Sequence, residues 1–363
     1  MTRPASSAGT SAGAIPIPAW SAAAVPWRRF VCLLLGTAGA ASLAAFAFVA
    51  AMDPYGLRAA PGRAPGPIMD LNQRFMYPQI VRSGAYDAAV FGTSTARLLD
   101  PQALDRAFGG RFANLAMNAA TPWEQMRLAR LFLGRVRATA VIFGLDASWC
   151  DPQADVKRLT FRPFPPWLYR EGAAWRGLFA QWNLQSVQIA GRVLLHRLGR
   201  MPERIRGDGY EVFTPPESTY DPVRASAHIR EMAAAQEPPA AGTAFPALGW
   251  LDGLLAAVPG EALRLIAFMP VHVAVQPKPG SSAAAQETAC KAQVTAIARR
   301  HGATVIDFRI PSPVTTQDAH YWDALHYRLP IADRLLQGLR RAVSLGEDDP
   351  DGFYRVLAHP AAG

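Results

Sequence analysis

An uncharged apolar run near the N-terminus is the feature that most constrains this chain. Residues 30–52 contain no Asp, Glu, Lys or Arg over 23 positions. A helix of this length, rising 1.5 Å per residue, would be about 35 Å long, which exceeds the roughly 30 Å thickness of a bilayer hydrocarbon core. We therefore expect one transmembrane helix over residues 30–52 and one large domain after it.

The flanks of this run predict its orientation. Arg28 and Arg29 precede it, and Asp53 is the first acidic residue of the chain. Because positive charge favours the cytoplasmic side, residues 1–29 are expected to form a cytoplasmic head and the rest to lie outside. A cleaved signal peptide is the alternative, but its apolar core spans only about 7–15 residues, so a retained anchor is favoured.

Composition excludes several functional classes. Half of the 363 residues are hydrophobic, which predicts a globular chain. The net charge is +9, but the arginines are dispersed among acids and no basic groove interleaved with aromatic residues is present, so we expect no nucleic-acid partner. No Cys/His cluster indicates a metal site, and no cofactor is expected. Cys150 and Cys290 could pair in an oxidising compartment, but nothing in the sequence places them together, so we interpret both as small apolar residues.

Strand-like and helix-like segments alternate over residues 87–343. The strands are expected at 87–92, 111–117, 138–144, 262–269 and 303–308, and helices at 94–108, 121–136, 248–258, 283–300 and 331–343. Alternation of this kind predicts an α/β fold, a three-layer α/β/α sandwich around a parallel five-stranded sheet. Residues 147–246 interrupt the pattern as an aromatic-rich insertion. Residues 53–86 are interpreted as an irregular linker and residues 344–363 as a loose tail.

Ligands of open parallel sheets bind beyond the carboxyl ends of the strands. Ser94 follows the first strand at a strand-to-helix turn, where free N–H groups can stabilise an oxyanion. Asp323 and His326, three residues apart, lie in the loop between the last predicted strand and helix. A hydroxyl nucleophile needs an imidazole base, and the base needs a carboxylate to orient it. These three residues therefore form a candidate catalytic triad.

Alternative interpretations of the same residues stay open. Asp323 and His326 could brace their loop together with Tyr327, and Asp318 with His320 forms a rival pair in the same loop. The i, i+2 spacing of that rival suits opposite directions on an extended chain, so the later pair is favoured.

Three short motifs resemble those of the SGNH (GDSL-type) hydrolase superfamily. They are Gly92-Thr-Ser94, the stretch from Asn114 to Thr121, and Asp323-Ala-Leu-His326-Tyr327. More narrowly, they are similar to membrane-anchored SGNH-like proteins related to the alginate O-acetylation factors. The resemblance implies a flavodoxin-like sheet, with Ser94 as nucleophile, His326 as base and Asp323 as its orienting carboxylate. It also implies oxyanion donors from the backbone N–H groups of Ser94 and Ala119.

The function implied by the resemblance is ester chemistry outside the bacterial cytoplasmic membrane. The expected protein is an esterase or O-acyltransferase, acting on acetyl esters of carbohydrate, with other polysaccharide-modification proteins as possible partners. Three positions depart from the family pattern. Thr93 replaces the aspartate of the first motif, a change that the wider family tolerates, and Ala119 replaces the glycine of the second. The oxyanion-binding asparagine of the third motif has no clear match, because the stretch from Gly144 to Ser148, which contains Asp146, occupies its place. The alternative is therefore a catalytically inactive SGNH-like scaffold or binding protein in cell-surface polysaccharide assembly.

Three further residues at strand ends are candidates for substrate contact: Asn118, Asp146 and His272. Asp146 could instead cap the segment after its strand, and His272 could be a surface residue. The arginine-rich stretch 191–206 could lie against anionic lipid, cover the site, or pack its apolar side on the core.

Overall fold

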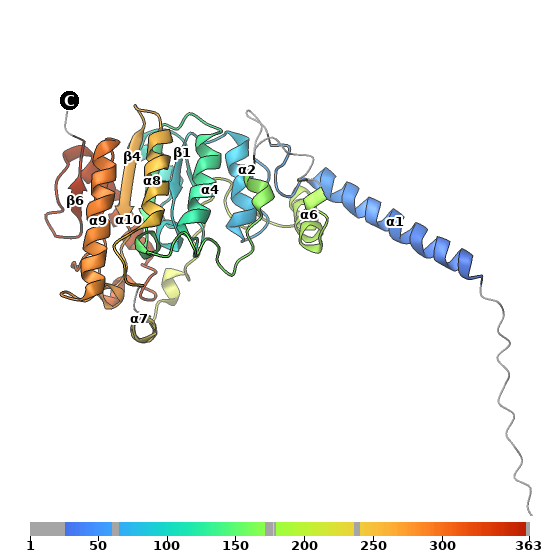
Figure 1. Ribbon diagram of the computed structural model, residues 1–363. Coiled ribbons are helices and arrows are strands. Elements are labelled where there is room, and N and C mark those ends of the chain that lie inside the picture. Colours follow the sequence, from blue (N-terminus) through green and yellow to red (C-terminus); the bar gives the residue numbers. More distant parts are fainter. Residues whose placement is uncertain (1–25, 60–64, 171–176, 178, 236–239, 361–363) are drawn as a thin grey trace, which may run out of the picture. The chain divides into compact units, whose positions relative to one another are not determined.

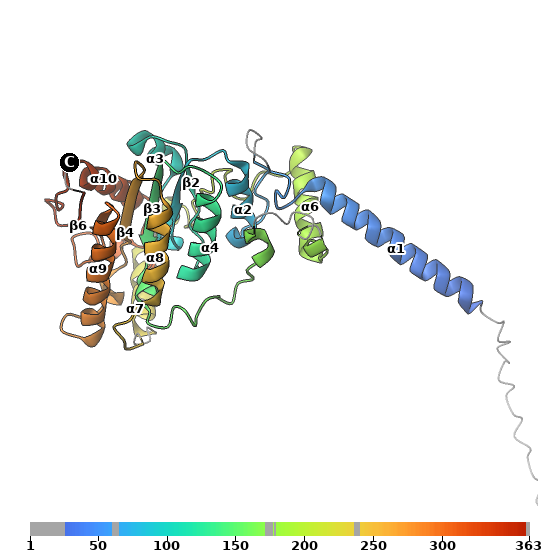
Figure 2. The same ribbon diagram turned by 45° about the horizontal axis from the view of Figure 1, so that its top comes forward.

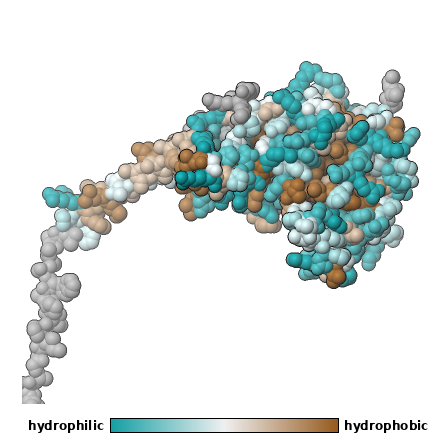
Figure 3. Space-filling view, turned by 180° about the vertical axis from the view of Figure 1, so that it is seen from behind, coloured by the Kyte–Doolittle hydropathy of each residue, from teal (hydrophilic) through white to brown (hydrophobic). Residues whose placement is uncertain are grey.

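The computed structural model describes residues 26–59, 65–170, 177, 179–235 and 240–360. Contacts divide the chain into two units, Met1–Ala47 and Phe48–Gly363. The first unit holds most of helix α1 (Trp27–Met52), which ends where the predicted span ends. Its side chains are mostly apolar and exposed (Figure 3), and the helix is long and apolar enough to cross a membrane.

The second unit is built on a mixed six-stranded sheet with the order β2-β1-β3-β4-β5-β6. The strands are β1 (Ala88–Phe91), β2 (Phe112–Asn114), β3 (Ala140–Leu145), β4 (Leu263–Phe268), β5 (Thr304–Asp307) and β6 (Arg355–Ala358). Strands β1 to β5 are parallel and match the five predicted strands to within a few residues.

The prediction of only five strands is wrong, because β6 pairs antiparallel with β5. It comes from residues 344–363, which were expected to be loose. Phe353 and Tyr354, just before β6, are buried and pack against Phe308, just after β5. Burial of these rings fixes the tail against the edge of the sheet.

Helices cover both faces of the sheet (Figures 1 and 2). The helices on one face are α2 (Gln73–Ser83), α4 (Pro122–Leu133), α8 (Pro246–Ala257) and α9 (Ser282–Arg300), and those on the other are α3 (Pro101–Phe108) and α10 (Leu329–Leu345). Neighbouring strand residues such as Val141 and Ile142 belong to the two different cores, as the alternation of side chains along a strand requires. The predicted three-layer arrangement is confirmed.

The interpretation of residues 53–86 as an irregular linker is wrong for α2, whose eleven residues are all buried. Polar residues and Pro78 concealed the helix in the sequence. Proline has no N–H to donate to the carbonyl four residues earlier. Here the hydroxyl of Tyr169 donates to that carbonyl, Arg74 O, at 2.8 Å. A tertiary contact thus replaces the missing helical hydrogen bond.

The predicted insertion carries short helices and turns. They are η2 (Ala147–Cys150), η3 (Pro166–Tyr169), α6 (Leu184–Arg197), η4 (Glu217–Thr219) and α7 (Pro222–Ala234). Three further short turns lie elsewhere: η1 (Ser94–Ala96), η5 (Val273–Val275) and η6 (Asp318–His320).

Cys150 and Cys290 form a disulfide between η2 and α9. Our interpretation of them as unpaired apolar residues is therefore wrong. The two cysteines are 140 residues apart in the sequence. They meet because η2 follows β3 on the face of the sheet that α9 covers, a proximity that only the folded sheet creates.

Candidate functional site

The chain after β1 places Ser94 at the start of the turn η1. This turn lies close against the neighbouring strand: a Cβ atom on Gly92 would come within 2.9 Å of Gly144 O and 2.8 Å of the Ala96 Cβ. Glycine at position 92 therefore permits the close approach of the chain around η1 to Gly144 of β3.

Asp323 shapes the loop that carries His326. One carboxylate oxygen, Oδ1, accepts hydrogen bonds from the N–H groups of Leu325 at 2.8 Å and His326 at 2.9 Å. The N–H of Trp322 donates to His326 O at 2.8 Å, which closes the turn. The second oxygen, Oδ2, lies 2.7 Å from His326 Nδ1. The Asp-x-x-His spacing thus gives a tight turn in which the carboxylate faces the imidazole.

Ser94 completes this arrangement. Its Oγ lies 2.9 Å from His326 Nε2, although the two residues are 232 positions apart. Tyr327 donates a hydrogen bond to the carbonyl of Thr95, which joins the two loops a second time. The structure therefore brings the three predicted residues together as a serine–histidine–aspartate relay, each of them partly exposed.

The electrostatics suit an ionised carboxylate beside the imidazole. Burial raises the pKa of Asp323. The hydrogen bond and charge of His326 and the two backbone N–H groups together lower it by more, so the pKa lies below its usual value. An ionised Asp323 holds a proton on His326 Nδ1 and leaves Nε2 free to accept one from Ser94.

The two predicted oxyanion donors lie on adjoining loops. Met117, just after β2, donates its N–H to Gly92 O at 3.0 Å, so the loop carrying Ala119 is fastened to the loop carrying Ser94. Within the described part of the chain, the N–H groups of Ser94 and Ala119 have no hydrogen-bond acceptor. Ala119 has a φ of 50°, in the left-handed region that favours glycine.

Arg74 of α2, which sequence reasoning missed, holds this left-handed turn. Its guanidinium is fully buried and donates to the carbonyls of Asn118 at 3.0 Å and Ala119 at 3.3 Å. The same group pairs with Glu124, itself fully buried, through hydrogen bonds of 2.9 and 2.6 Å. With a further one to Thr160, five hydrogen bonds fix the guanidinium, and the two to Asn118 and Ala119 hold the peptide groups of the left-handed turn.

Arg97 and Phe213 were also missed. Phe213, from the insertion, packs its ring edge-to-face on His326 with 5.5 Å between centroids. The guanidinium of Arg97 lies over the same ring at 4.7 Å and pairs with Glu211. Arg97 lies three residues after Ser94, but no sequence signal links either residue to Phe213, more than a hundred positions later.

The remaining predicted residues act in different ways. Asn118 accepts a hydrogen bond from Arg97 at 3.0 Å. Asp146 caps η2, accepting from the N–H of Ser148 at 2.9 Å and from its hydroxyl, which matches the capping alternative. Neither contact requires a substrate.

His272 is buried, at 5% exposure, and is not a surface residue. The backbone N–H of His272 donates to Ala324 O at 2.8 Å. The ring nitrogen Nδ1 accepts a hydrogen bond from the backbone N–H of Ala274, which places the ring proton on Nε2. Nε2 lies 3.1 Å from a carboxylate oxygen of Asp318. His272 therefore braces the loop that carries the triad, and Asp318, paired with it, forms no pair with His320.

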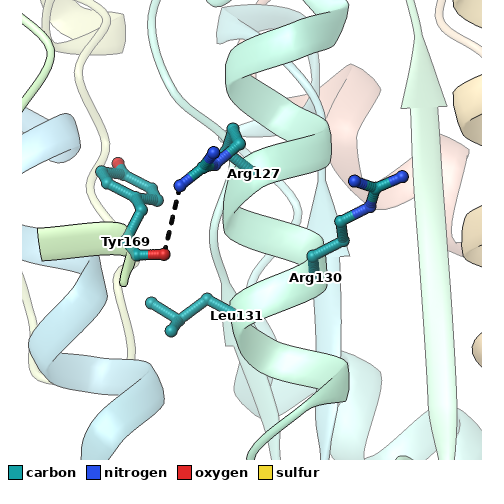
Figure 4. A pocket seen from close by; sticks show the side chains of 4 residues that line it. All are labelled: Arg127, Arg130, Leu131 and Tyr169. Atoms are coloured by element: carbon teal, nitrogen blue, oxygen red, sulfur yellow. Dashed lines mark hydrogen bonds between the residues drawn. The ribbon is translucent and has the colours of Figure 1, made fainter. Parts of the chain in front are cut away.

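An open cavity of about 200 Å³ lies elsewhere, lined by Arg127, Arg130, Leu131 and Tyr169 (Figure 4). Arg127 turns toward Tyr169 and donates to its carbonyl, whereas Arg130 points away. The cavity shares no residue with the triad. Among the residues that the structure describes, no group of three or more His, Cys, Asp or Glu side chains could hold a metal ion.

No protein-family model matches this chain, and no curated protein matches its sequence. The site must therefore be interpreted from its own geometry.

Proposed function

We propose that this chain is a membrane-anchored serine esterase or O-acyltransferase of the SGNH type. The observation that carries the proposal is the relay from Ser94 Oγ through His326 to the Asp323 carboxylate, with contacts of 2.9 and 2.7 Å. These distances lie within the range in which a base can take a proton from a nucleophile.

The reaction begins with attack of Ser94 Oγ on the carbonyl carbon of an ester. His326 Nε2 takes the hydroxyl proton as the C–O bond forms, and the Asp323 carboxylate stabilises the resulting imidazolium. The N–H groups of Ser94 and Ala119 bind the oxyanion of the tetrahedral intermediate. When the intermediate collapses, His326 returns the proton to the leaving alcohol and an acyl-Ser94 ester remains.

The second half uses the same groups in reverse. His326 takes a proton from water or from a sugar hydroxyl, whose oxygen attacks the acyl carbon and releases Ser94. Water gives hydrolysis, and a sugar hydroxyl gives transfer. The choice of an acetylated carbohydrate as substrate follows the resemblance of the site motifs to the alginate O-acetylation factors.

The proposed location is the outer side of a bacterial cytoplasmic membrane, with α1 as a retained anchor and Arg28 and Arg29 inside. The disulfide between Cys150 and Cys290 supports an oxidising compartment for the domain, because disulfides rarely persist in the cytosol.

A catalytically inactive scaffold in polysaccharide assembly is the second candidate. It is favoured by one observation: β3 is followed by the carboxylate of Asp146, and no asparagine side chain follows this strand to serve as a third oxyanion donor. Loss of one such donor slows an enzyme by about 10²–10³.

Labelling of the purified full chain with a fluorophosphonate separates the two candidates. We expect labelling of the wild type and none of Ser94→Ala. Ser148→Ala, which removes a hydroxyl bonded to Asp146 at the next strand end, is the matched control and should label normally. Folded wild-type protein that fails to label would contradict the esterase and favour the scaffold.

A further inference from the structure

Helix α6 has one face in the core and one in solvent. Its inner face is formed by Ser186, Ile189, Ala190 and Val193, which are buried at helical spacing. Leu184, Leu195 and Leu198 are 72%, 37% and 59% exposed. Leu195 and Leu198 follow Leu184 by about three and four helical turns, so the three leucines lie along one side of the helix, opposite the buried face. An exposed apolar stripe of this kind needs a partner.

Both ends of α6 are attached to the chain where α1 ends. The Arg197 guanidinium donates to the carbonyl of Met52, the last residue of α1, at 3.2 Å. Near the other end, Ser186 Oγ lies 3.1 Å from the hydroxyl of Tyr55. All these residues belong to the unit Phe48–Gly363. Within this unit, the last residue of the predicted membrane span therefore lies against α6.

The charge next to the leucine stripe is positive. Arg197, Arg200 and Arg204 are exposed and, within the described residues, pair with no carboxylate. Arg192 does pair with Asp70. The only acidic residue between positions 191 and 206 is Glu203. Leucines flanked by arginines that have no carboxylate partner are the composition of a helix that lies in a membrane interface.

We propose that the outer face of α6 docks on anionic lipid headgroups. Leu184, Leu195 and Leu198 enter the interface, while the three arginines bind lipid phosphates. The proposal rests on the membrane anchor of the proposed function and is independent of catalysis. It adds a second attachment, which prevents the domain from rotating freely about the end of α1.

Fluorescence quenching in nanodiscs tests the docking with the full chain. In a Cys32→Ser background, Leu198→Cys carries an environment-sensitive fluorophore. Leu345→Cys, a 53% exposed leucine at the end of α10, is the matched control. With phosphatidylglycerol and spin-labelled lipid, we expect a blue shift and at least about twofold stronger quenching at position 198 than at 345. Equal quenching at the two positions would overturn the proposal.

Charge reversal tests the choice of anionic lipid. Each arginine near an anionic surface contributes roughly fivefold to binding. The pair Arg200→Glu and Arg204→Glu, which leaves the contact between Arg197 and Met52 in place, should therefore abolish most of the extra quenching at position 198. The control pair Arg340→Glu and Arg341→Glu, on α10, should not. Quenching at 198 that survives the first pair, or that is unchanged in phosphatidylcholine alone, would contradict recognition of anionic headgroups.

A fluorophore on the native Cys32, which is exposed on α1, separates failure of docking from failure of the anchor. Quenching by lipid at Cys32 without quenching at position 198 would retain the anchor and overturn the docking. No quenching at Cys32 would overturn both. Fluorophosphonate labelling of Ser94 in the same samples reports the esterase independently.

Discussion

Asp323 uses both carboxylate oxygens, one to form its own turn and one to hold the imidazole. This local geometry could be predicted, because an Asp-x-x-His spacing brings the two groups together within one turn. The contact with Ser94 could be predicted only through topology, since parallel strands end at one edge. Arg74 and Phe213 could not be predicted, because nothing near them in sequence belongs to the site.

Asp323→Asn should lower kcat sharply while the fold is kept. The amide can still accept a hydrogen bond but no longer stabilises the imidazolium, and a comparable change in a serine protease costs about 10⁴ in rate. Steady-state ester hydrolysis measures the effect. Asp318→Asn, in the same loop but facing His272, is the control and should retain most of the rate. Similar losses in the two variants would argue against a triad.

His272 should make stability depend on pH. Burial lowers its pKa below 6.5, although Asp318 opposes the shift. Below pH 6.5 the unfolded chain therefore takes up a proton that the folded chain resists, so this contribution to stability is present above pH 6.5 and lost as the pH falls. In His272→Asn the acid-side decline of the unfolding free energy should be shallower. Parallel pH profiles of the two proteins would refute this.

At the scale of elements, the sequence predicted the strands well and one helix not at all. The parallel strands are mostly apolar, as is typical of strands buried on both faces of a sheet. Helix α2 lacks that signal because four of its eleven residues are Gln or Arg and one is Pro78. The guanidinium and the carbonyl of Arg74 find their partners in Glu124 and Tyr169, more than forty residues away. The helix is therefore stable only in its tertiary setting.

Arg74→Lys should affect catalysis through position rather than contact with substrate. An ammonium cannot bind Glu124 with two parallel hydrogen bonds and hold two carbonyls as well. Misplacing the Ala119 N–H should lower kcat by up to about 10² and leave KM nearly unchanged. Arg82→Lys, on the same helix and bonded to Leu168 O, is the control for general destabilisation. An equal fall of kcat in both variants would assign Arg74 a purely structural role.

At the scale of the whole molecule, alternating strands and helices predicted the layers and the parallel order. The predictions failed where segments distant in sequence meet in the fold. One case is β6, which pairs at the edge of the sheet, and the other is the disulfide that joins η2 to α9. These contacts depend on burial of side chains such as Phe353, which become neighbours of the sheet only after folding.

The disulfide should contribute to global stability. A cross-link closing a long loop typically contributes about 2–4 kcal/mol, mainly by restricting the unfolded chain. The double variant Cys150→Ser and Cys290→Ser should unfold at correspondingly lower denaturant concentration, and Ser94 labelling should persist below that transition. Alkylation of both cysteines in the native, unreduced protein would show that the cross-link is absent.

The position of Phe213 has a further consequence. A ring supplied by the aromatic-rich insertion contacts the imidazole of His326, whereas the proposed nucleophile, Ser94, follows a strand of the sheet. Exchanging the insertion for another of similar length would alter which substrates fit without changing any reacting atom. Under the proposed mechanism, the insertion could therefore change substrate preference while Ser94, His326 and Asp323 stay the same.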